Sequence, residues 1–362
     1  MRALVLRGFG DAAVEEVPDP VPGPGEVVVD VACVQPSVTE CMLLAGEPVA
    51  MHAVLAGRLA AGPTRFGGHE FAGVVRTLGP GVEESWAGAR VTAVETAACG
   101  RCAACRRDRP DACPSPAILG FTGPGAFAER VVVPARTLVR VPDGVSAAQA
   151  AAIQPLAGAI HGHAAAGVRP GDSVLVIGAG VMGVLHTQVA RHGNAGLVMV
   201  SGRSPAKREL AERAGADLVL DAAADVAAEV LAATEGIGAD VVFETAGADT
   251  FGLAAACVRR GGSIVMVSVL PDQAPAPLAR MRERSVTLLH PRSGAGGYSP
   301  GSGAFEHALR LVSRGDVDVS CLITHRLTGV EALPQALEIT RDKGRFGALG
   351  PAQVDLFDWS RA

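Results

Sequence analysis

Aromatic side chains are scarce in this sequence, and neither sign of charge is in large excess. Aromatic residues make up 4% of the 362 residues, and Tyr298 is the single tyrosine. The 32 Lys and Arg residues stand against 37 Asp and Glu residues, a formal net charge of −5. Because no basic excess is present to neutralise phosphates, we do not expect a nucleic-acid partner. Charged residues at 19% and hydrophobic residues at 49% exclude a disordered chain.

Long apolar runs are missing as well. Residues 144–168 carry no charge, but Gln149, His161 and several glycines interrupt them. A membrane-spanning helix needs about 20 predominantly apolar residues, so this stretch is too polar to be one. At the N-terminus, Arg7 comes before any apolar signal-peptide core develops. We therefore expect a cytoplasmic protein without a membrane partner, and its length favours two domains.

Cysteine, by contrast, is concentrated in one place. Four of the eight cysteines lie close together, namely Cys99, Cys102, Cys105 and Cys113. In a reducing compartment such a cluster indicates a metal more often than disulfides. Four thiolates suit a tetrahedral structural zinc with no open coordination position, so we predict a zinc lobe over about residues 95–115. The alternative is a loop of reduced surface cysteines among arginines. The scattered Cys41, Cys257 and Cys321 are predicted to be small buried residues.

The pattern of the chain changes near residue 155. Before it, short β-branched runs such as 26–31 and 129–133 are separated by Pro-Gly turns. After it, apolar runs alternate with segments of helix length, which predicts an α/β fold with a parallel sheet buried on both faces. We expect strands over 173–177, 197–200, 240–243 and 263–267, and helices over 181–192, 205–214 and 303–314.

A glycine-rich turn follows the first apolar strand of this second part. It has the pattern G-x-G-x-x-G and comprises Gly178, Ala179, Gly180, Val181, Met182 and Gly183. Glycines at these positions allow a tight turn, a close approach of the backbone to a pyrophosphate, and close contact between helix and strand. The free N–H groups of the helix N-terminus attract the phosphates. We predict a dinucleotide site here; the alternative is a tight turn without a ligand.

The end of the next strand indicates which dinucleotide binds. An acidic residue about 20 positions after the glycines would accept hydrogen bonds from the ribose of NAD. The sequence instead has Ser201, Gly202, Arg203 and Ser204, with Lys207 one helical turn later. A guanidinium pairs well with a 2′-phosphate, so NADP(H) is favoured over NAD(H). The alternative is that Arg203 and Lys207 are ordinary surface charges.

These motifs together resemble the zinc-containing alcohol dehydrogenase family of the medium-chain dehydrogenase/reductase superfamily, in its threonine/sorbitol dehydrogenase-like branch. Further matches are Pro24-Gly25-Glu26-Val27, Gly68-His69-Glu70 and Gln154-Pro155-Leu156. The resemblance implies a GroES-like, mostly β catalytic domain over 1–155 and 296–362, and a Rossmann NADP-binding domain over 156–295. It also implies hydride transfer to or from a small-molecule substrate, and a homodimer or homotetramer.

The sequence departs from this family at the catalytic zinc. Where the family has its first zinc ligand, a cysteine, this chain has Ser37, and Gln154 falls on the third ligand position. The histidine of the G-H-E motif is retained as His69, followed by Glu70. A neutral hydroxyl is a poor zinc ligand, and an amide brings no charge. We therefore expect one structural zinc and no catalytic zinc.

Several residues are candidates for the chemistry. The resemblance makes Thr39 a hydrogen-bond donor to substrate, with the capping of a turn as the alternative. Without a metal, His69 is a candidate general acid, with a structural role as the alternative. Glu70 is expected to orient the site or to form a plain buried ion pair. Tyr298 could also donate a proton, although packing in its loop is the favoured interpretation.

The predicted function is that of an NADPH-dependent oxidoreductase that transfers hydride to an activated C=C, C=N or carbonyl group. Such polarised acceptors need less help from a Lewis acid than a simple ketone does. The first alternative is an ordinary zinc-dependent alcohol dehydrogenase or ketone reductase. In that case water, Ser37, His69, Glu70 or Gln154 would still hold the metal. The second alternative is a non-catalytic NADP-binding protein.

Overall fold

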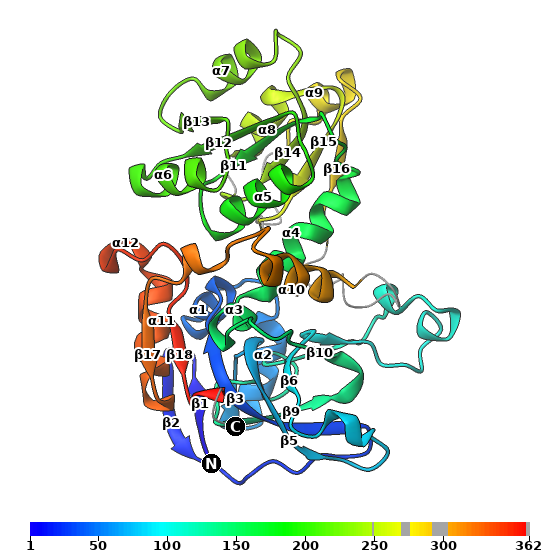
Figure 1. Ribbon diagram of the computed structural model, residues 1–362, viewed down its shortest axis with the longest axis vertical. Helices are drawn as coiled ribbons and strands as arrows, with labels where there is room; N and C mark the ends of the chain where they lie inside the picture. Colours follow the sequence, from blue (N-terminus) through cyan, green and yellow to red (C-terminus); the bar gives the residue numbers. More distant parts are fainter. Residues whose placement is uncertain (248–249, 269–275, 292–302, 360–362) are drawn as a thin grey trace. The chain divides into compact units, whose positions relative to one another are not determined.

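The computed structural model describes residues 1–247, 250–268, 276–291 and 303–359. The chain forms two compact units, which are described separately (Figure 1). The first comprises Met1–Gln154, Gly294–Arg314 and Val319–Ala362, and the second comprises Pro155–Ser293 and Gly315–Asp318. Tyr298 and the domain boundary predicted at residue 296 lie outside the described residues. Within the described residues, no helix combines the length and the apolar character that crossing a membrane requires.

The first unit is built around a seven-stranded sheet. Its strand order is β10-β6-β5-β3-β18-β17, with β9 also paired to β3. The strands are β3 (Glu26–Gln35), β5 (Glu70–Leu78), β6 (Arg90–Ala93), β9 (Arg130–Pro134), β10 (Leu138–Arg140), β17 (Arg326–Thr328) and β18 (Gln353–Asp355). In Figure 1 the red β18 lies beside the blue β3, and the two strands pair antiparallel. Segments from both ends of the chain therefore complete one sheet.

Smaller elements surround this sheet. A three-stranded sheet has the order β2-β1-β4, and β7 pairs with β8 next to the cysteine lobe. These strands are β1 (Arg2–Gly8), β2 (Asp11–Glu16), β4 (Thr64–Arg65), β7 (Thr96–Ala97) and β8 (Ala117–Ile118). The helices are α1 (Val38–Leu44), α2 (His52–Ala60), α3 (Ala147–Ala151), α10 (Ala304–Arg314), α11 (Leu333–Arg341) and α12 (Lys343–Phe346).

The second unit has a six-stranded sheet in which all neighbouring strands are parallel. The order is β13-β12-β11-β14-β15-β16. The strands are β11 (Ser173–Ile177), β12 (Leu197–Gly202), β13 (Leu218–Asp221), β14 (Ala239–Glu244), β15 (Val258–Met266) and β16 (Thr287–Leu289). The helices are α4 (Ile153–Ala166), which begins in the first unit, α5 (Val181–His192), α6 (Pro205–Arg213), α7 (Val226–Ala233), α8 (Phe251–Cys257) and α9 (Leu278–Glu283). The predicted α/β fold is confirmed.

Most predicted elements of the second unit have the expected bounds. Two predictions were wrong: the start of one strand of this unit, and the burial of one cysteine of the first unit. Strand β15 begins at Val258, five residues before the predicted start. It runs through Gly261, whose φ of +68° lets the strand continue past an irregularity in its pairing with β14. Cys321, expected to be buried, is only partly buried and lies in the short 3₁₀ helix Ser320–Leu322. Cys41 and Cys257 are buried as expected.

Two histidines are buried in the second unit without compensating charge. His163 on α4 stacks against Phe243 and His186 on α5 lies tilted against it, with ring centroids 4.3 Å away in each case. Among the described residues, His163 Nε2 and both ring nitrogens of His186 have no hydrogen-bond partner. Burial lowers the pKa of His163 to about 3 and that of His186 well below its ordinary value. Both imidazoles are therefore neutral in the folded protein at neutral pH.

Mild acid is expected to destabilise the second unit through this pair. Since the folded pKa values are depressed, the unfolded chain binds protons that the folded protein does not, and stability is lost as pH falls below about 6.5. The slope for each histidine grows from about 0.7 kcal/mol per pH unit at pH 6.5 to about 1.4 well below it, so its mean between pH 6.5 and 5.5 is about 1 kcal/mol per pH unit. We expect His186→Leu to reduce the slope of the unfolding free energy, measured in urea between about pH 6.5 and 5.5, by this amount. The exposed His192→Leu should keep the wild-type slope, and equal slopes in both variants would contradict the prediction.

Candidate functional site

The glycine-rich turn between β11 and α5 is closely packed on one side and open on the other. A side chain at Gly183 would place its Cβ 1.8 Å from the carbonyl oxygen of Gly178, and Gly178 itself has a φ of +106°. The Thr245 hydroxyl donates to the carbonyls of Ile177, at 2.9 Å, and Gly178, at 3.0 Å. Gly180 is the N-cap of α5 and has open space beside it. The turn therefore fits a diphosphate at the N-terminus of α5. Val181 and Met182, the first two residues of α5, lie at the same end of the helix.

The end of β12 has a steric reason to carry glycine. A Cβ at Gly202 would lie 2.7 Å from the Cβ of Ala179 in the glycine-rich turn. Ser201 before it is buried, whereas Arg203 after it is exposed. Ser204 is the N-cap of α6 but makes no capping bond with its side chain, and Lys207 on that helix is partly buried.

Arg208, which the sequence analysis did not single out, supports the same loop. It donates to the carbonyl of Gly202 at 2.9 Å and forms an ion pair with Asp221 at 3.0 Å. The three cationic residues near the end of β12 thus differ: Arg208 is held by the fold, Lys207 is partly buried, and Arg203 is exposed. Arg203 is thus the exposed cationic side chain next to Gly202.

The cysteine lobe brings four sulfur atoms together. The Sγ atoms of Cys99, Cys102, Cys105 and Cys113 all lie within 4.8 Å of one another. The Cys102–Cys105 separation is 3.4 Å and the Cys99–Cys105 separation is 4.0 Å, close to the edge of about 3.8 Å in a tetrahedron with zinc–sulfur bonds of about 2.3 Å. The backbone N–H groups of Arg101 and Cys102 lower the pKa of Cys99 to about 6. The residues therefore fit a structural zinc.

Loss of this zinc is expected to unfold the lobe locally. We predict that Cys102→Ser removes one zinc per chain, because a structural zinc binds and folds its ligand loop in one step. Trypsin cleavage after Arg106 and Arg107 should accelerate by at least about tenfold, since local opening exposes the backbone. Elemental analysis and timed digestion measure the two effects. Cys321→Ser is the matched control; a zinc content and a cleavage rate equal to the control would contradict the prediction.

A second polar cluster is buried in the first unit, and we call it the acidic centre: Glu40, His69, Glu70, Glu95 and Gln154. Glu40 lies on α1 and is completely buried. Its carboxylate accepts hydrogen bonds from the backbone N–H groups of Gly68, at 2.7 Å, and Ser37, at 2.8 Å, and contacts His69 Nδ1 at 2.8 Å. The Ser37 hydroxyl accepts from the N–H of Glu40, so both residues cap α1. Glu40 thereby fixes the orientation of His69.

The close approach of two chain segments explains this arrangement. Gly68 has a φ of +84°, and a Cβ there would lie 2.3 Å from the backbone nitrogen of Phe127. A glycine is required at this contact, and it directs the N–H of Gly68 at Glu40. His69 follows directly and Glu70 begins β5. The sequence motif Gly68-His69-Glu70 thus serves the local backbone as well as the site.

The charges of the acidic centre alter one another. Burial alone would lower the pKa of His69, but Glu40 and the other carboxylates raise it to about 9. Burial would raise the pKa of Glu40, yet His69 and the N–H donors bring it below its ordinary value. Burial raises the pKa of Glu70 to about 7, although His69 and Gln35 oppose the shift. His69 is therefore an imidazolium at neutral pH, and its Nε2 lies 3.6 Å from Glu70 Oε1.

The remaining members of the acidic centre come from distant segments. Glu95 lies between β6 and β7, and its Oε1 accepts a hydrogen bond of 3.2 Å from the side-chain amide of Gln154 near the start of α4. Its Oε2 has no partner within the described residues, and burial raises its pKa. Glu70 Oε2 accepts a hydrogen bond of 2.5 Å from Gln35. Thr39 lies on α1 and is partly buried.

The acidic centre does not fit a zinc held by thiolate. Ser37, at the position of the family's first ligand, uses its hydroxyl to cap α1. Two nearby cysteine thiols are directed elsewhere: Cys33 donates to Gln353 and Cys41 to the carbonyl of Leu337. Throughout the described ranges, only the cysteine lobe gathers three or more candidate ligand atoms of His, Cys, Asp or Glu. What the acidic centre offers is an oriented, positively charged imidazole among carboxylates.

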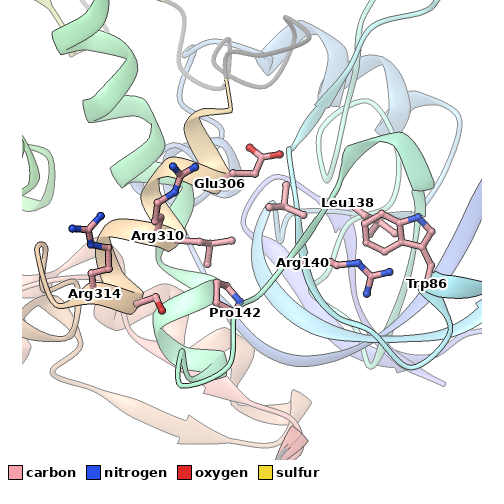
Figure 2. A pocket seen from close by; sticks show the side chains of 10 residues that line it. Trp86, Leu138, Arg140, Pro142, Glu306, Arg310 and Arg314 are labelled. Carbon is pink, nitrogen blue, oxygen red and sulfur yellow. The ribbon is translucent and has the colours of Figure 1, made fainter.

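Two surface cavities lie in the first unit apart from these residues. One, of about 440 Å³, is lined by Trp86 and Arg140 on one side and by Glu306, Arg310 and Arg314 of α10 on the other (Figure 2). The Arg140 guanidinium lies 4.4 Å above the ring of Trp86. The other, of about 550 Å³, includes Arg90 and Trp359 among its lining residues. Neither cavity contains a residue of the acidic centre.

Comparison with known proteins gives consistent matches over nearly the whole chain. Residues 23–143 match the model for the alcohol dehydrogenase GroES-like domain, and residues 181–314 match that for zinc-binding dehydrogenases. The L-threonine 3-dehydrogenase of Pyrococcus horikoshii is 32% identical over 338 residues, which cover 92% of this chain and 93% of that protein.

Solved structures agree with these matches. A protein from Sinorhizobium meliloti 1021, solved with bound NADP, has 29% sequence identity and a TM-score of 0.82, with 98% of each chain covered. The alcohol dehydrogenase TADH from Thermus sp. ATN1 has 28% identity and a TM-score of 0.84, covering 98% of this chain and 100% of that one.

Proposed function

Because this chain belongs to the zinc-binding family of medium-chain alcohol dehydrogenases, as its motifs suggested, we propose that it is an NADP(H)-dependent oxidoreductase. We propose that it transfers hydride to an activated C=C, C=N or carbonyl group of a small organic molecule. We further propose that the reaction needs no thiolate-bound catalytic zinc. The observation that carries the proposal is His69, a buried imidazole whose Nδ1 lies 2.8 Å from the Glu40 carboxylate, in a centre without a thiolate. Cytoplasmic location and assembly as a homodimer or homotetramer stay predictions.

The proposed chemistry divides the work between the cofactor and the acidic centre. When bound, NADPH supplies the hydride that adds to the electrophilic carbon of the substrate. The electron pair of the double bond moves to its other end. In a carbonyl, an activated C=C or a neutral imine this end takes a proton from Nε2 of His69, whereas an iminium nitrogen is neutralised by the pair itself. Glu40 keeps Nδ1 protonated and the ring oriented, while Glu70, with a pKa of about 7, is suited to return a proton to Nε2. Thr39 is proposed to donate a hydrogen bond to the substrate.

A substrate panel tests this proposal. We would follow NADPH oxidation with cyclohex-2-enone, crotonaldehyde, a cyclic iminium and acetophenone, and NADP⁺ reduction with L-threonine, the substrate in the name of the Pyrococcus horikoshii relative. Turnover of the polarised acceptors by protein with one zinc per chain is the expected result. Two zincs per chain with turnover of acetophenone or threonine would favour the ordinary zinc-dependent dehydrogenase. Cofactor binding without any turnover would favour the non-catalytic protein.

The cofactor preference gives a separate prediction. We expect NADPH to bind more tightly than NADH, because Arg203 is exposed beside Gly202 and no carboxylate occupies the end of β12. Arg203→Ala should weaken NADPH binding by about 10- to 100-fold, the range of a lost charged hydrogen bond, and leave NADH binding unchanged. Fluorescence titration of bound NADPH measures this effect. Arg213→Ala, at the other end of α6, is the control; tighter binding of NADH by the wild type would refute the preference.

A further inference from the structure

We propose that Gln35 and Gln353 are positioning residues of the acidic centre: two buried amides in series that hold the Glu70 carboxylate in place opposite His69. The inference deepens the proposed function, and it rests on that function for the role of His69 and Glu70. It adds two residues that none of the sequence motifs indicates. Gln353 comes from β18, near the other end of the chain from Gln35 on β3.

The two amides form a continuous chain of hydrogen bonds. Gln353 Nε2 donates to Gln35 Oε1 at 2.8 Å, and Gln35 Nε2 donates to Glu70 Oε2 at 2.5 Å. The second hydrogen of Gln353 Nε2 is directed at the carbonyl of Ala148, also at 2.8 Å. The Cys33 thiol donates to Gln353 Oε1 at 3.6 Å. Gln35 is 2% exposed and Gln353 is fully buried, so water does not replace these bonds.

The direction of this chain is determined at its Ala148 end. A backbone carbonyl can only accept hydrogen bonds, so Gln353 must turn its NH₂ group to Ala148. The same nitrogen faces Gln35, which must therefore present Oε1 to it and turn its own NH₂ group to Glu70. Every donor between Gln353 and Glu70 points toward the carboxylate, which favours its ionised form and restricts its rotation.

The pairing of three strands brings the two amides and Glu70 together. Gln35 and Glu70 are paired directly across the antiparallel strands β3 and β5. On the other side of β3, Val34 is paired with Val354 of β18, the residue after Gln353. Three neighbouring strands thus bring the side chains together, and the opposite oxygen of Glu70, Oε1, lies 3.6 Å from His69 Nε2. Loss of the amide would leave Glu70 Oε2 without this donor and free the carboxylate to turn away from His69.

A network that only joined strands would affect stability alone, so the test separates the two roles. We would prepare Gln35→Leu and Gln353→Leu, with Thr92→Val as the matched control, because Thr92 on β6 also loses one buried hydrogen bond, to the carbonyl of Phe71. The most active acceptor of the panel with NADPH gives kcat and KM. For Gln35→Leu we expect kcat to fall by at least about tenfold with KM within about twofold, since an interaction made in the transition state is lost. A smaller loss in the same direction is expected for Gln353→Leu.

A double variant tests whether the amide acts through Glu70. In a Glu70→Gln background, Gln35→Leu should cause no further loss of kcat, because coupled residues are not additive. A full additional loss would overturn the proposal.

Histidine NMR gives a readout that needs no substrate. With ¹³C- and ¹⁵N-labelled histidine, the His69 ring signals, identified by their loss in His69→Gln, should shift in Gln35→Leu and stay at their wild-type positions in Thr92→Val. If no acceptor is turned over, the proposed function fails but this shift still decides whether Gln35 orients the centre. Unchanged His69 signals in Gln35→Leu, or wild-type kcat, would overturn the inference.

Discussion

Glu40→Ala is expected to lower the free energy of unfolding of the first unit by about 3–5 kcal/mol, the range for breaking a buried ion pair. The glutamate is completely buried, and its carboxylate holds His69 Nδ1 and the N–H groups of Gly68 and Ser37. The substitution leaves an imidazolium and two backbone donors buried without their acceptor. Activity should fall below detection, because the proposed acid loses its orientation. Urea unfolding, followed by circular dichroism, measures the change in stability.

A surface ion pair provides the matched control for this prediction. Glu338 is exposed and pairs with Arg345 at 2.9 Å, and such exposed pairs contribute about 0–1 kcal/mol. Glu338→Ala should therefore stay within about 1 kcal/mol of the wild type and retain activity. If Glu40→Ala and Glu338→Ala proved equally stable, Glu40 would not be the central acceptor that the structure describes.

Gly183→Ala is expected to have a comparably large effect on the second unit. The added Cβ would lie 1.8 Å from the carbonyl oxygen of Gly178. Since both atoms belong to rigid parts of the turn, relief requires a shift of α5 away from β11. We expect a loss of at least about 3 kcal/mol, at the upper end of overpacking effects, and NADPH affinity reduced at least about tenfold. Thermal unfolding and fluorescence titration measure the two effects.

The neighbouring glycine supplies the control within the same motif. Gly180 is the N-cap of α5 with a φ of −82°, and no heavy atom lies within 4 Å of the Cβ it would acquire. Gly180→Ala should therefore change the stability by no more than about 1 kcal/mol. A stability loss in Gly180→Ala as large as that in Gly183→Ala would show that the close contact between Gly183 and Gly178 is not the cause.

The fold of the second unit could be predicted because local and global signals agree there. The strand Ser173–Ile177 and the helix Val181–His192 have the bounds expected from sequence. An apolar run, a glycine turn and an amphipathic segment follow one another, and each indicates the same βαβ arrangement. Strand β15 was harder, because Gly261 interrupts its apolar pattern and only its pairing with β14 shows that the strand continues.

The acidic centre could be predicted only in part. His69 and Glu70 belong to a local motif, and Ser37 with Glu40 has the S-x-x-E spacing of a capping box that could have indicated a role for Glu40. Glu95 stands just before the cysteine lobe without any local pattern of its own. Gln35 and Gln353 are 318 residues apart, and only the pairing of β3 with β5 and β18 brings them to Glu70. Their contribution depends on tertiary contacts, which local spacing does not encode.

The discontinuous course of the first unit imposes an order on its synthesis. Translation delivers β3 early, yet its neighbour β18 leaves the ribosome only after the whole stretch Pro155–Ser293 of the second unit. The second unit, nearly continuous in the chain, can fold before β18 pairs with Cys33 and Val34 of β3. Until β18 has been synthesised, Gln35 Oε1 lacks its hydrogen bond from Gln353 Nε2. The acidic centre can therefore be completed only after the second unit has been synthesised.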